Sequence, residues 1–246
     1  MTQLKALIFD VDGTLAETER DGHRIAFNRA FSEADLNWYW SENLYGELLE
    51  ISGGKERIRH YIQQYHPKIK ESLETLIPQL HQAKTTHYCD LLSSGEIQLR
   101  PGVKRLIEEA YNQKIRLAIA TTSALPNALA LLEKHLNPHW FEVIAAGDIV
   151  ADKKPSPDIY NYVLEKMDLN PEECLVFEDS FHGLQAAAQA NLKTIITLHD
   201  YTKNQDFSLA SLVLNNLGEP HNNFTVIRGD FPNKGYFDLE LAKVLT

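Results

Sequence analysis

The sequence predicts an α/β fold, in which a parallel sheet carries helices on both faces and a small helical domain is inserted into it. Three observations lead to this prediction. Short apolar runs recur along the 246-residue chain, helical patterns separate these runs, and a segment of about 80 residues between the first two runs holds no convincing strand. Strands that alternate with helices in this way form crossover units, which build parallel sheets.

The predicted strands are apolar along their whole length, as expected for strands that are buried on both faces of a parallel sheet. They are residues 4–9, 115–120, 143–146, 175–177 and 194–197. Helical patterns lie between them at residues 103–112, 127–135, 157–167 and 183–190. The tail after Gly218 is rich in turn-forming residues, so it is predicted to be a C-terminal extension.

The segment of residues 16–94 is too long to be a loop. Its apolar residues recur at helical spacing, in the groups Ile25, Ala26 and Ala30, then Ile58, Tyr61 and Ile62, then Leu76, Leu80 and Ala83. We therefore expect residues 1–15 and 95–246 to form the core, and residues 16–94 to form the inserted helical domain.

The composition indicates a globular protein that binds neither nucleic acid nor membranes. Hydrophobic residues make up 43% of the chain, enough for a core, and the formal net charge of −10 disfavours a broad basic surface. Cys89 and Cys174 lie far apart without a C-x-x-C motif, so neither a disulfide framework nor a zinc ribbon is indicated. The N-terminus resembles neither a secretory signal nor a transit peptide, and no later segment is predicted to span a membrane. A reducing, cytoplasmic location is expected.

Residues 52–58 read SGGKERI and permit two interpretations. In the first they are a variant of the nucleotide-binding P-loop, but Glu56 stands where that motif has Ser or Thr, and no glycine lies five residues before Gly54. In the second they begin a helix, with Ser52 as its N-cap and Ile58 on its buried side. Taken alone, the segment favours the helix start.

Two carboxylates follow the first predicted strand, in the sequence DVDGT. Side chains alternate along a strand, so Asp10 and Asp12 tend to point the same way, while Gly13 allows a sharp turn. Open parallel sheets bind ligands at the carboxyl ends of their strands, and two carboxylates this close need a cation or a proton. A plain strand-terminating turn is the alternative. A calcium loop fails, because Leu15 and Asp21 stand where it requires Gly and Glu.

Polar residues also follow later predicted strands. Thr121 and Thr122 could bind a phosphate oxygen through a hydroxyl and nearby backbone N–H groups, or could simply cap a helix. In the sequence DKKPSPD one lysine could supply a fixed positive charge, or the loop could be solvated. Glu178 and Asp179 form a second acidic pair whose oxygens suit magnesium. The combination is more specific than any of its parts.

In this order the motifs resemble those of the haloacid dehalogenase superfamily of phosphotransferases. They are DVDGT from Asp10, a strand that ends in Thr121, KPSPDIY from Lys154 and EDS from Glu178. The resemblance extends to about residue 200 and is greatest for the subgroup of beta-phosphoglucomutase and the CbbY-type sugar-bisphosphate phosphatases, with SGGKERI as the discriminating segment. It implies a Rossmann-like core, an inserted helical cap and dependence on magnesium.

The resemblance also implies a role for each motif residue. Asp10 would be the nucleophile that forms an aspartyl-phosphate, and Asp12 the acid that protonates the leaving group and then activates water. Lys154 and Thr121 would stabilise the charge on the transferring phosphoryl group. Because the dehalogenases lack an acid at the position of Asp12, carbon–halogen cleavage is disfavoured.

The same resemblance implies where magnesium binds. The ion would contact Asp10, the backbone carbonyl of Asp12 and Asp179, with Glu178 near or in its coordination shell. The chain departs from the family pattern at Asn191, where a glycine is expected, and in its C-terminal tail.

Residues of the inserted helices are expected to select the substrate. Glu17 is the better candidate to bind sugar hydroxyls, while His23 either faces the site or begins an exposed amphipathic helix. Lys55 and Arg57 of SGGKERI would bind the distal phosphate of a sugar bisphosphate. Lys84 aligns with a cap lysine that faces the active site in the mutase subgroup, or is an exposed helix lysine.

The resemblance implies that the substrate is xylulose-1,5-bisphosphate, a rubisco inhibitor that CbbY-type enzymes dephosphorylate in connection with carbon fixation. We therefore expect a monomeric phosphatase that acts on a sugar phosphate or bisphosphate. The nearest alternative is a sugar phosphomutase, which returns the phosphoryl group to the sugar. The alternative from another class is a catalytically silent binding protein on the same fold, against which the intact set of acidic residues argues.

Overall fold

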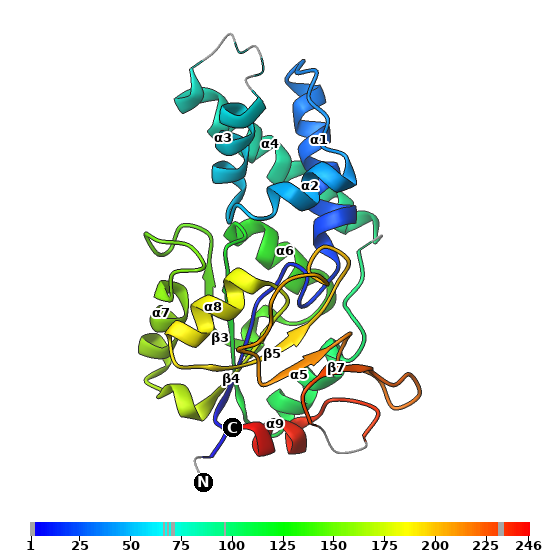
Figure 1. The fold of residues 1–246 in the computed structure, drawn as a ribbon, viewed down its shortest axis with the longest axis vertical. Helices are drawn as coiled ribbons and strands as arrows, with labels where there is room; N and C mark the ends of the chain where they lie inside the picture. The colour runs from blue at the N-terminus through cyan, green and yellow to red at the C-terminus, as the bar shows by residue number, and fades with distance from the viewer. Residues whose placement is uncertain (1–2, 66, 68, 70–71, 96, 231–233) are drawn as a thin grey trace.

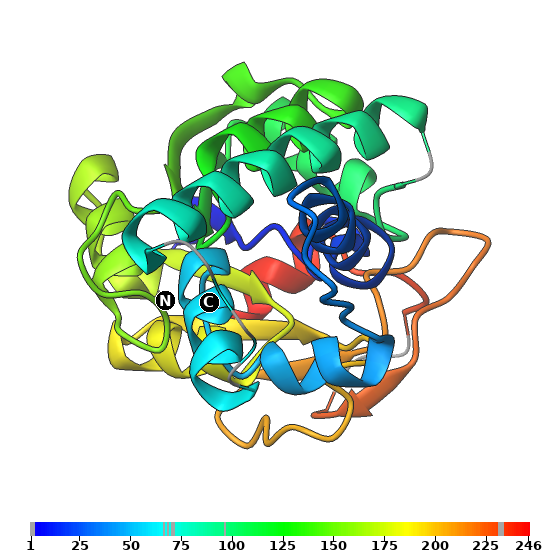
Figure 2. The same cartoon turned by 90° about the horizontal axis from the view of Figure 1, so that it is seen from above.

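The computed structural model describes residues 3–65, 67, 69, 72–95, 97–230 and 234–246. These residues form a sheet covered by helices, with a second group of helices beyond one end of the sheet (Figure 1). The N-terminus lies at the opposite end, so the second group stands above the carboxyl end of the first strand. Figure 2, seen from above, shows this second group lying over the sheet part.

The sheet has the strand order β3-β2-β1-β4-β5-β6-β7. Neighbouring strands pair in parallel, except for β6 and β7, which are antiparallel. The predicted α/β fold is therefore confirmed, and each predicted strand overlaps an observed one. The strands are β1 (Ala6–Phe9), β2 (Arg116–Thr121), β3 (Phe141–Ala146), β4 (Cys174–Glu178), β5 (Lys193–Thr197), β6 (Leu212–Leu214) and β7 (Val226–Arg228).

Two hydrophobic clusters cover the two faces of the sheet. Leu7 and Phe9 of β1 pack with helices α5, α6 and α9 on one face, whereas Ala6 and Ile8 pack with α7 and α8 on the other. Consecutive residues of β1 thus face opposite clusters, as the two-residue period of a strand requires. These helices are α5 (Val103–Asn112), α6 (Leu125–His135), α7 (Asp158–Met167), α8 (Phe181–Gln189) and α9 (Leu239–Leu245).

The inserted segment folds into helices that have a hydrophobic core of their own. Its centre is aromatic, with the rings of Phe27 and Trp40 4.7 Å apart between their centroids, and Trp40 is fully buried. No strand forms among the described residues of this segment. This separate core supports the predicted cap, whose limits at residues 16 and 94 stay a prediction. Its elements are a π-helical turn (Glu19–His23), α1 (Arg24–Glu33), α2 (Glu42–Leu48), α3 (Gly54–Tyr65) and α4 (Leu73–Ser94).

The segment SGGKERI begins helix α3, but Ser52 is not its cap. The first helical hydrogen bond runs from the Arg57 N–H to the Gly53 carbonyl, at 3.0 Å, so Gly53 occupies the N-cap position. Gly53 has a φ of +92°, a conformation that glycine adopts without strain. A side chain at this position would also collide with the carboxylate of Glu56. The chain therefore needs glycine, rather than a serine cap, at the start of this helix.

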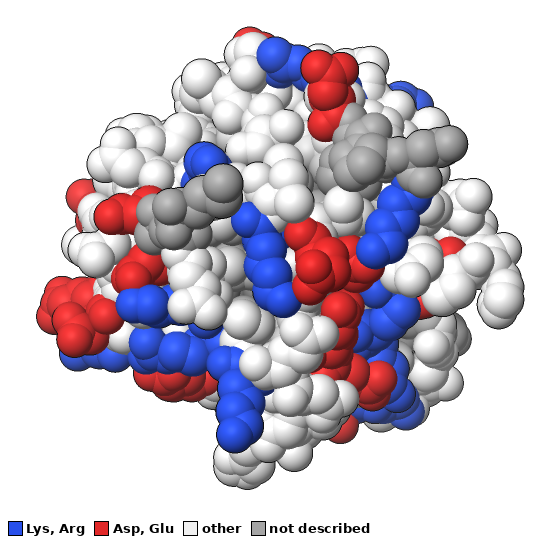
Figure 3. All heavy atoms as spheres, turned by 90° about the horizontal axis from the view of Figure 1, so that it is seen from below, with Lys and Arg blue, Asp and Glu red and all other residues white. Residues whose placement is uncertain are grey.

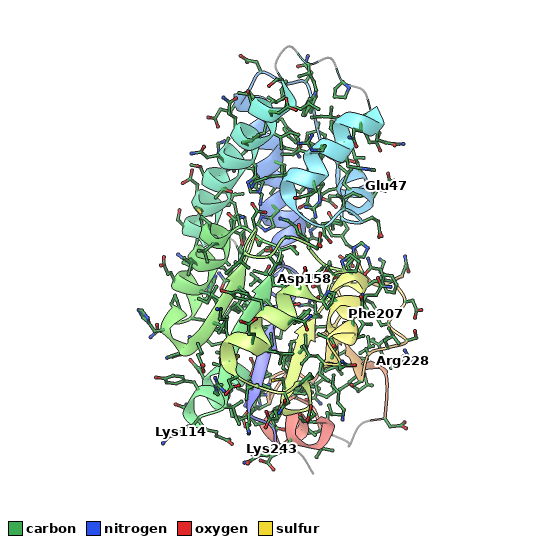
Figure 4. All side chains as sticks on the ribbon, turned by 90° about the vertical axis from the view of Figure 1, so that its left-hand side faces the viewer. Glu47, Lys114, Asp158, Phe207, Arg228 and Lys243 are labelled. Carbon is green, nitrogen blue, oxygen red and sulfur yellow. The ribbon has the colours of Figure 1, made fainter. Side chains whose placement is uncertain are left out.

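The tail after Gly218 adds to the sheet part instead of extending away from it. Strand β7 pairs with β6, and the Arg228 side chain donates a hydrogen bond to the Phe207 carbonyl at 2.7 Å (Figure 4). Phe237 is fully buried, with its ring edge-on to Phe177 of β4 at 5.4 Å. Helix α9 follows and covers one face of the sheet. The tail therefore packs as part of the sheet domain and is not a separate extension.

Asn191 takes the place of the glycine expected after helix α8. Its φ is +59°, in the left-handed region that asparagine tolerates better than most residues. The N–H groups of Asn191 and Leu192 donate to the carbonyls of Ala188 and Ala187, at 3.0 and 2.9 Å. The residue thereby ends the helix as glycine commonly does.

The sequence predicts that the chain binds neither nucleic acid nor membranes, and two structural observations concern this prediction. Figure 3 views the end of the molecule away from helices α1–α4, and there basic and acidic side chains lie next to one another. Within the described part of the chain, no helix combines the length and the apolar composition needed to cross a membrane.

Candidate active site

Polar residues from three neighbouring strands meet at one edge of the sheet. The register places Phe9 of β1 level with Ile119 of β2 and Phe177 of β4, so the residues that follow these positions lie close together. Figure 4 places Asp158, the first residue of α7, midway along the molecule, between Glu47 of α2 and Lys243 of α9. A pocket is lined by the sequence-predicted residues Asp10, Asp12, Arg57, Thr121, Thr122, Lys154 and Asp179.

Lys154 connects the first strand to the fourth. Its Nζ lies 2.7 Å from Asp10 Oδ1 and 2.6 Å from Glu178 Oε1, and it also donates to the Ala120 carbonyl at 2.8 Å. Burial by itself would lower the pKa of Lys154, but Asp10 and Glu178 raise it well above its ordinary value, so the lysine stays charged. Burial also raises the pKa of Asp10, against the attraction of Lys154.

Glu178 is fully engaged by its surroundings. Its Oε1 accepts hydrogen bonds from Lys154 and from the Tyr160 hydroxyl at 2.8 Å, and its Oε2 accepts from the backbone N–H of Asp179 at 3.1 Å. A side chain at Gly183 would collide with this carboxylate, so glycine is required there. The Glu178 side chain is only 1% exposed. Its hydrogen bond with Lys154 holds that lysine beside Asp10.

Three buried carboxylates form a cluster that could hold a metal ion. Asp10, Glu178 and Asp179 each offer one oxygen, and these oxygens all lie within 4.8 Å of one another. Lys154 contacts two of them and supplies one positive charge. Carboxylate oxygens are ligands that hard divalent cations prefer, and the remaining negative charge is costly when buried without such a cation. The residues therefore fit a hard divalent metal ion.

Asp12 lies in a separate set of hydrogen bonds beside this cluster. Its Oδ1 is 2.5 Å from the Thr18 hydroxyl and 2.8 Å from His23 Nε2. Burial alone would raise the pKa of Asp12, but the charge and hydrogen bond of His23 hold it well below its usual range. His23 is buried and contacts the site, so the structure excludes the alternative of an exposed helix start.

The cap contributes two buried cations, Arg57 and Lys84. Arg57 lines the pocket and donates to the carbonyls of Leu48 and Ile51, at 3.0 and 3.2 Å, and to the Tyr45 hydroxyl at 3.1 Å. Lys84 is 4% exposed and lines a hollow that shares Asp12, Glu19 and Arg57 with the pocket. Burial lowers the pKa of Lys84 to about 8. The alternative of an exposed helix lysine is therefore excluded.

Two of the predicted substrate-binding residues line neither the pocket nor the neighbouring hollow. Lys55 lies 2.6 Å from Asp148 on the loop after β3, and its side chain is 42% exposed. Residues two apart in a helix face different ways, so Lys55 and Arg57 of α3 do not act on the same side. Glu17 pairs with Arg100 at 3.2 Å and is 55% exposed outside the pocket. Glu19 lines the pocket instead and accepts a hydrogen bond from Tyr45.

The sequence did not predict Tyr160 and His199 as site residues, although both contact its carboxylates. Tyr160 stands in the KPSPDIY motif, and its hydroxyl donates a hydrogen bond to Glu178 Oε1 at 2.8 Å. His199 follows β5 and lies 2.7 Å from Asp179, and no sequence motif marks it. The pocket is also lined by Ser180, His182, Tyr201, Thr202 and Gln205.

Residues 4–191 match the family model of haloacid dehalogenase-like hydrolases. The chain belongs to this family. It is 45% identical to Protein CbbY of Cereibacter sphaeroides, over 88% of this chain and 94% of that protein. It is also 33% identical to the phosphorylated carbohydrates phosphatase of Thermotoga maritima, over 78% of this chain and 84% of that one.

A solved structure extends the similarity to the fold. A mutant CbbY from Rhodobacter sphaeroides in complex with xylulose-(1,5)bisphosphate has 44% sequence identity and a TM-score of 0.82, and the alignment covers 89% of this chain and 96% of that one. The predicted family and the predicted enzyme class, a phosphatase, are confirmed by these relationships.

Proposed function

We propose that this phosphatase is magnesium-dependent and removes one phosphoryl group from xylulose-1,5-bisphosphate through an aspartyl-phosphate on Asp10. The observation that carries the proposal is the separation of charges in and around one pocket. Carboxylates and Lys154 gather at its sheet end, whereas Arg57 and Lys84 gather at its cap end. A molecule with a phosphate at each end fits this arrangement, and a relative of known structure binds such a molecule.

At the sheet end, Asp10 would attack the phosphorus atom. Lys154 holds one Asp10 oxygen at 2.7 Å and would also face the negative charge that develops on the phosphoryl oxygens. Thr121 is buried, and its Oγ1 accepts a hydrogen bond from the Ser123 N–H at 3.1 Å, which leaves the hydroxyl hydrogen for a phosphoryl oxygen. Thr122 lines the same wall. These residues act chiefly by position and charge, as is usual in phosphoryl transfer.

Asp12 would transfer protons in both half-reactions. A phosphoryl group beside Asp12 raises the pKa of this carboxylate, because like charges disfavour ionisation, and the proton gained can pass to the leaving sugar oxygen. After the sugar leaves, the ionised Asp12 would take a proton from the water that attacks phosphorus, while the bond between phosphorus and Asp10 breaks and inorganic phosphate is released. The hydrogen bonds from Thr18 and His23 keep its Oδ1 in place throughout.

A bound Mg²⁺ would be held by Asp10, the Asp12 carbonyl and Asp179, with Glu178 behind them, and would neutralise charge on the phosphoryl oxygens. The buried carboxylate cluster supports this assignment. In this proposal the main role of Glu178 is to hold Lys154 in place, because both oxygens of Glu178 already accept hydrogen bonds from the protein.

At the cap end, Arg57 and Lys84 would bind the distal phosphate in place of the predicted pair of Lys55 and Arg57. Arg57 has five N–H donors and uses three toward the described residues, so two are left for a ligand. Lys84 lies over the rings of Phe27 and Tyr88 and makes no hydrogen bond to a described residue. A buried ammonium without an acceptor is costly, and an anionic ligand removes that cost. Glu19, rather than Glu17, would then contact the sugar hydroxyls.

The test is a comparison of two reactions. The enzyme is incubated with Mg²⁺ and xylulose-1,5-bisphosphate, and separately with Mg²⁺, β-glucose 1-phosphate and glucose 1,6-bisphosphate. Release of inorganic phosphate in the first reaction, without glucose 6-phosphate in the second, is the expected result. Glucose 6-phosphate formed at a comparable rate would assign the chain to the phosphomutases instead. No turnover in either reaction would favour the binding protein.

A further inference from the structure

His199 is a buried side chain in the site to which the proposed reaction assigns no step. It follows strand β5, its side chain is 4% exposed, and its Nε2 lies 2.7 Å from Asp179 Oδ2. Asp179 is one of the carboxylates that would hold the metal ion in the proposed function. The contact therefore joins a loop of the core directly to the predicted metal site.

The orientation of the imidazole is set by the backbone around it. The Tyr201 N–H donates to His199 Nδ1 at 3.3 Å, so Nδ1 accepts and Nε2 carries the ring hydrogen. The His199 N–H donates to the Thr202 hydroxyl at 3.2 Å, and the His199 carbonyl accepts from the Thr202 N–H at 3.0 Å. Because Nε2 carries a hydrogen, it donates to Asp179 and has no lone pair with which to bind a metal ion.

Arg100 holds the two residues that precede His199 in the chain. Its guanidinium donates to the carbonyls of Thr197 and Leu198 and also to the Gly13 carbonyl, in the turn after Asp12. Arg100 is buried, and Leu198 is further tied to β6 by a bond from its N–H to the Leu214 carbonyl at 2.8 Å. The loop that carries His199 is thus anchored to the turn that carries the other acids.

The two oxygens of Asp179 are held from two directions. Thr14 donates to Oδ1 at 3.1 Å, and His199 donates to Oδ2 at 2.7 Å. Two donors on different oxygens fix the plane of a carboxylate, and the remaining lone pairs stay available for a cation. Partners behind metal ligands act in this way, and their loss commonly weakens metal binding about 10–100-fold.

We propose that His199 is a positioning residue that orients Asp179 for metal binding by donating a hydrogen bond from Nε2. The inference rests on the metal dependence in the proposed function. It assigns His199 no contact with the substrate and no coordination of the ion. What matters is a hydrogen-bond donor at the position of Nε2.

The experiment compares three replacements of one side chain. In His199→Gln the amide nitrogen reaches the position of Nε2, in His199→Asn it reaches only that of Nδ1, and His199→Ala has no donor. Binding of Mn²⁺ to each full-length protein, without substrate, is measured from the loss of the free-ion electron paramagnetic resonance signal. Mg²⁺ affinity follows from competition. Melting in the presence of a chelator verifies that each variant folds.

We expect the Ala and Asn variants to bind both ions about 10–100-fold more weakly than the wild-type protein, and the Gln variant to recover most of the loss. Equal affinity of the wild-type and Ala proteins would overturn the inference while leaving the proposed function intact. A folded Gln variant that binds as weakly as the Ala variant would overturn it as well. If the wild-type protein binds neither ion, the metal dependence of the proposed function fails too. If the Ala variant does not fold, the Asn and Gln variants carry the comparison.

Discussion

Lys55 Nζ lies 2.6 Å from Asp148 Oδ2, so the lysine of SGGKERI joins the cap to the core instead of facing the pocket. Lys153 lies 2.9 Å from the same Asp148 and 3.7 Å from Glu56, which follows Lys55 in helix α3. The four side chains form a charge cluster across the junction between α3 and the loop after β3. Arg57 follows Glu56 in helix α3, but its side chain points away from this charge cluster and lines the pocket.

Replacement of Arg57 is expected to impair use of a bisphosphate far more than replacement of Lys55. Arg57→Ala removes charged hydrogen-bond donors from the pocket and should raise KM for xylulose-1,5-bisphosphate roughly 10–100-fold. Lys55→Ala breaks a largely exposed ion pair and should change KM by less than about threefold. Steady-state kinetics on the bisphosphate, with p-nitrophenyl phosphate as the one-phosphate control, measures both. Equal effects of the two variants on the bisphosphate would return Lys55 to the binding site.

Asp10→Asn should abolish phosphate release and leave the protein folded. The amide cannot attack phosphorus, so we expect kcat to fall by a factor on the order of 10⁴ or more. Stability should not fall, because the change removes one of three crowded carboxylates whose burial is unfavourable. Phosphate release and the melting temperature are the two measurements. Turnover near the wild-type rate in this variant would show that another residue is the nucleophile.

The affinity for the bisphosphate is expected to fall as the pH rises through the pKa of Lys84, about 8. The ammonium that would face the distal phosphate is mostly charged at pH 7 and mostly neutral at pH 9, so KM should rise about tenfold between these values. The variant Lys84→Met serves as the control, because its KM should be high and nearly constant over the same range. A wild-type KM that does not change from pH 7 to pH 9 contradicts the role of Lys84.

Lys84 is also expected to lower the free energy of unfolding near neutral pH. Its pKa is about 8 in the folded protein, against 10.5 as the ordinary value, so the unfolded chain binds more protons between these two values. The free energy of unfolding contributed by Lys84 therefore increases as the pH rises from about 8 to 10.5. At pH 7, Lys84→Met should be more stable than the wild-type protein by about 3 kcal/mol, and this difference should shrink as the pH rises from about 8 to 10.5. Urea unfolding at several pH values measures it, and a constant difference would argue against the lowered pKa.

Much of the sheet and one whole helix could be predicted from local patterns. Helix α5 was predicted at residues 103–112, the bounds that the structure has, because its apolar residues keep one strict helical face. Strands β6 and β7 were missed, since each has only three residues and β7 is exposed along its length. Such short segments carry no periodicity, and pairing with distant residues determines their structure.

Asp10, Asp12, Asp179, the two threonines and Lys154 could be predicted as candidate site residues because they stand in short motifs along the chain, and the structure brings them to one pocket. The direction of a side chain on a helix could not be predicted in the same way. Only the packing of α3 against its neighbours separates Arg57, which is 7% exposed, from Lys55, which is 42% exposed in its side chain. His199 has no motif at all, and its contact joins residues that lie 20 positions apart.

The α/β core could be predicted from local periodicity, and the family and the acidic residues near the strand ends from motifs whose order resembles that of the family. Three relationships are visible only in the folded chain: which cap cations face the pocket, the contact of Glu178 with Lys154, and the contact of His199 with Asp179. Those relationships depend on burial and on contacts between distant segments. A lysine with a lowered pKa and a carboxylate held on both oxygens arise only when folding removes water and brings such segments together.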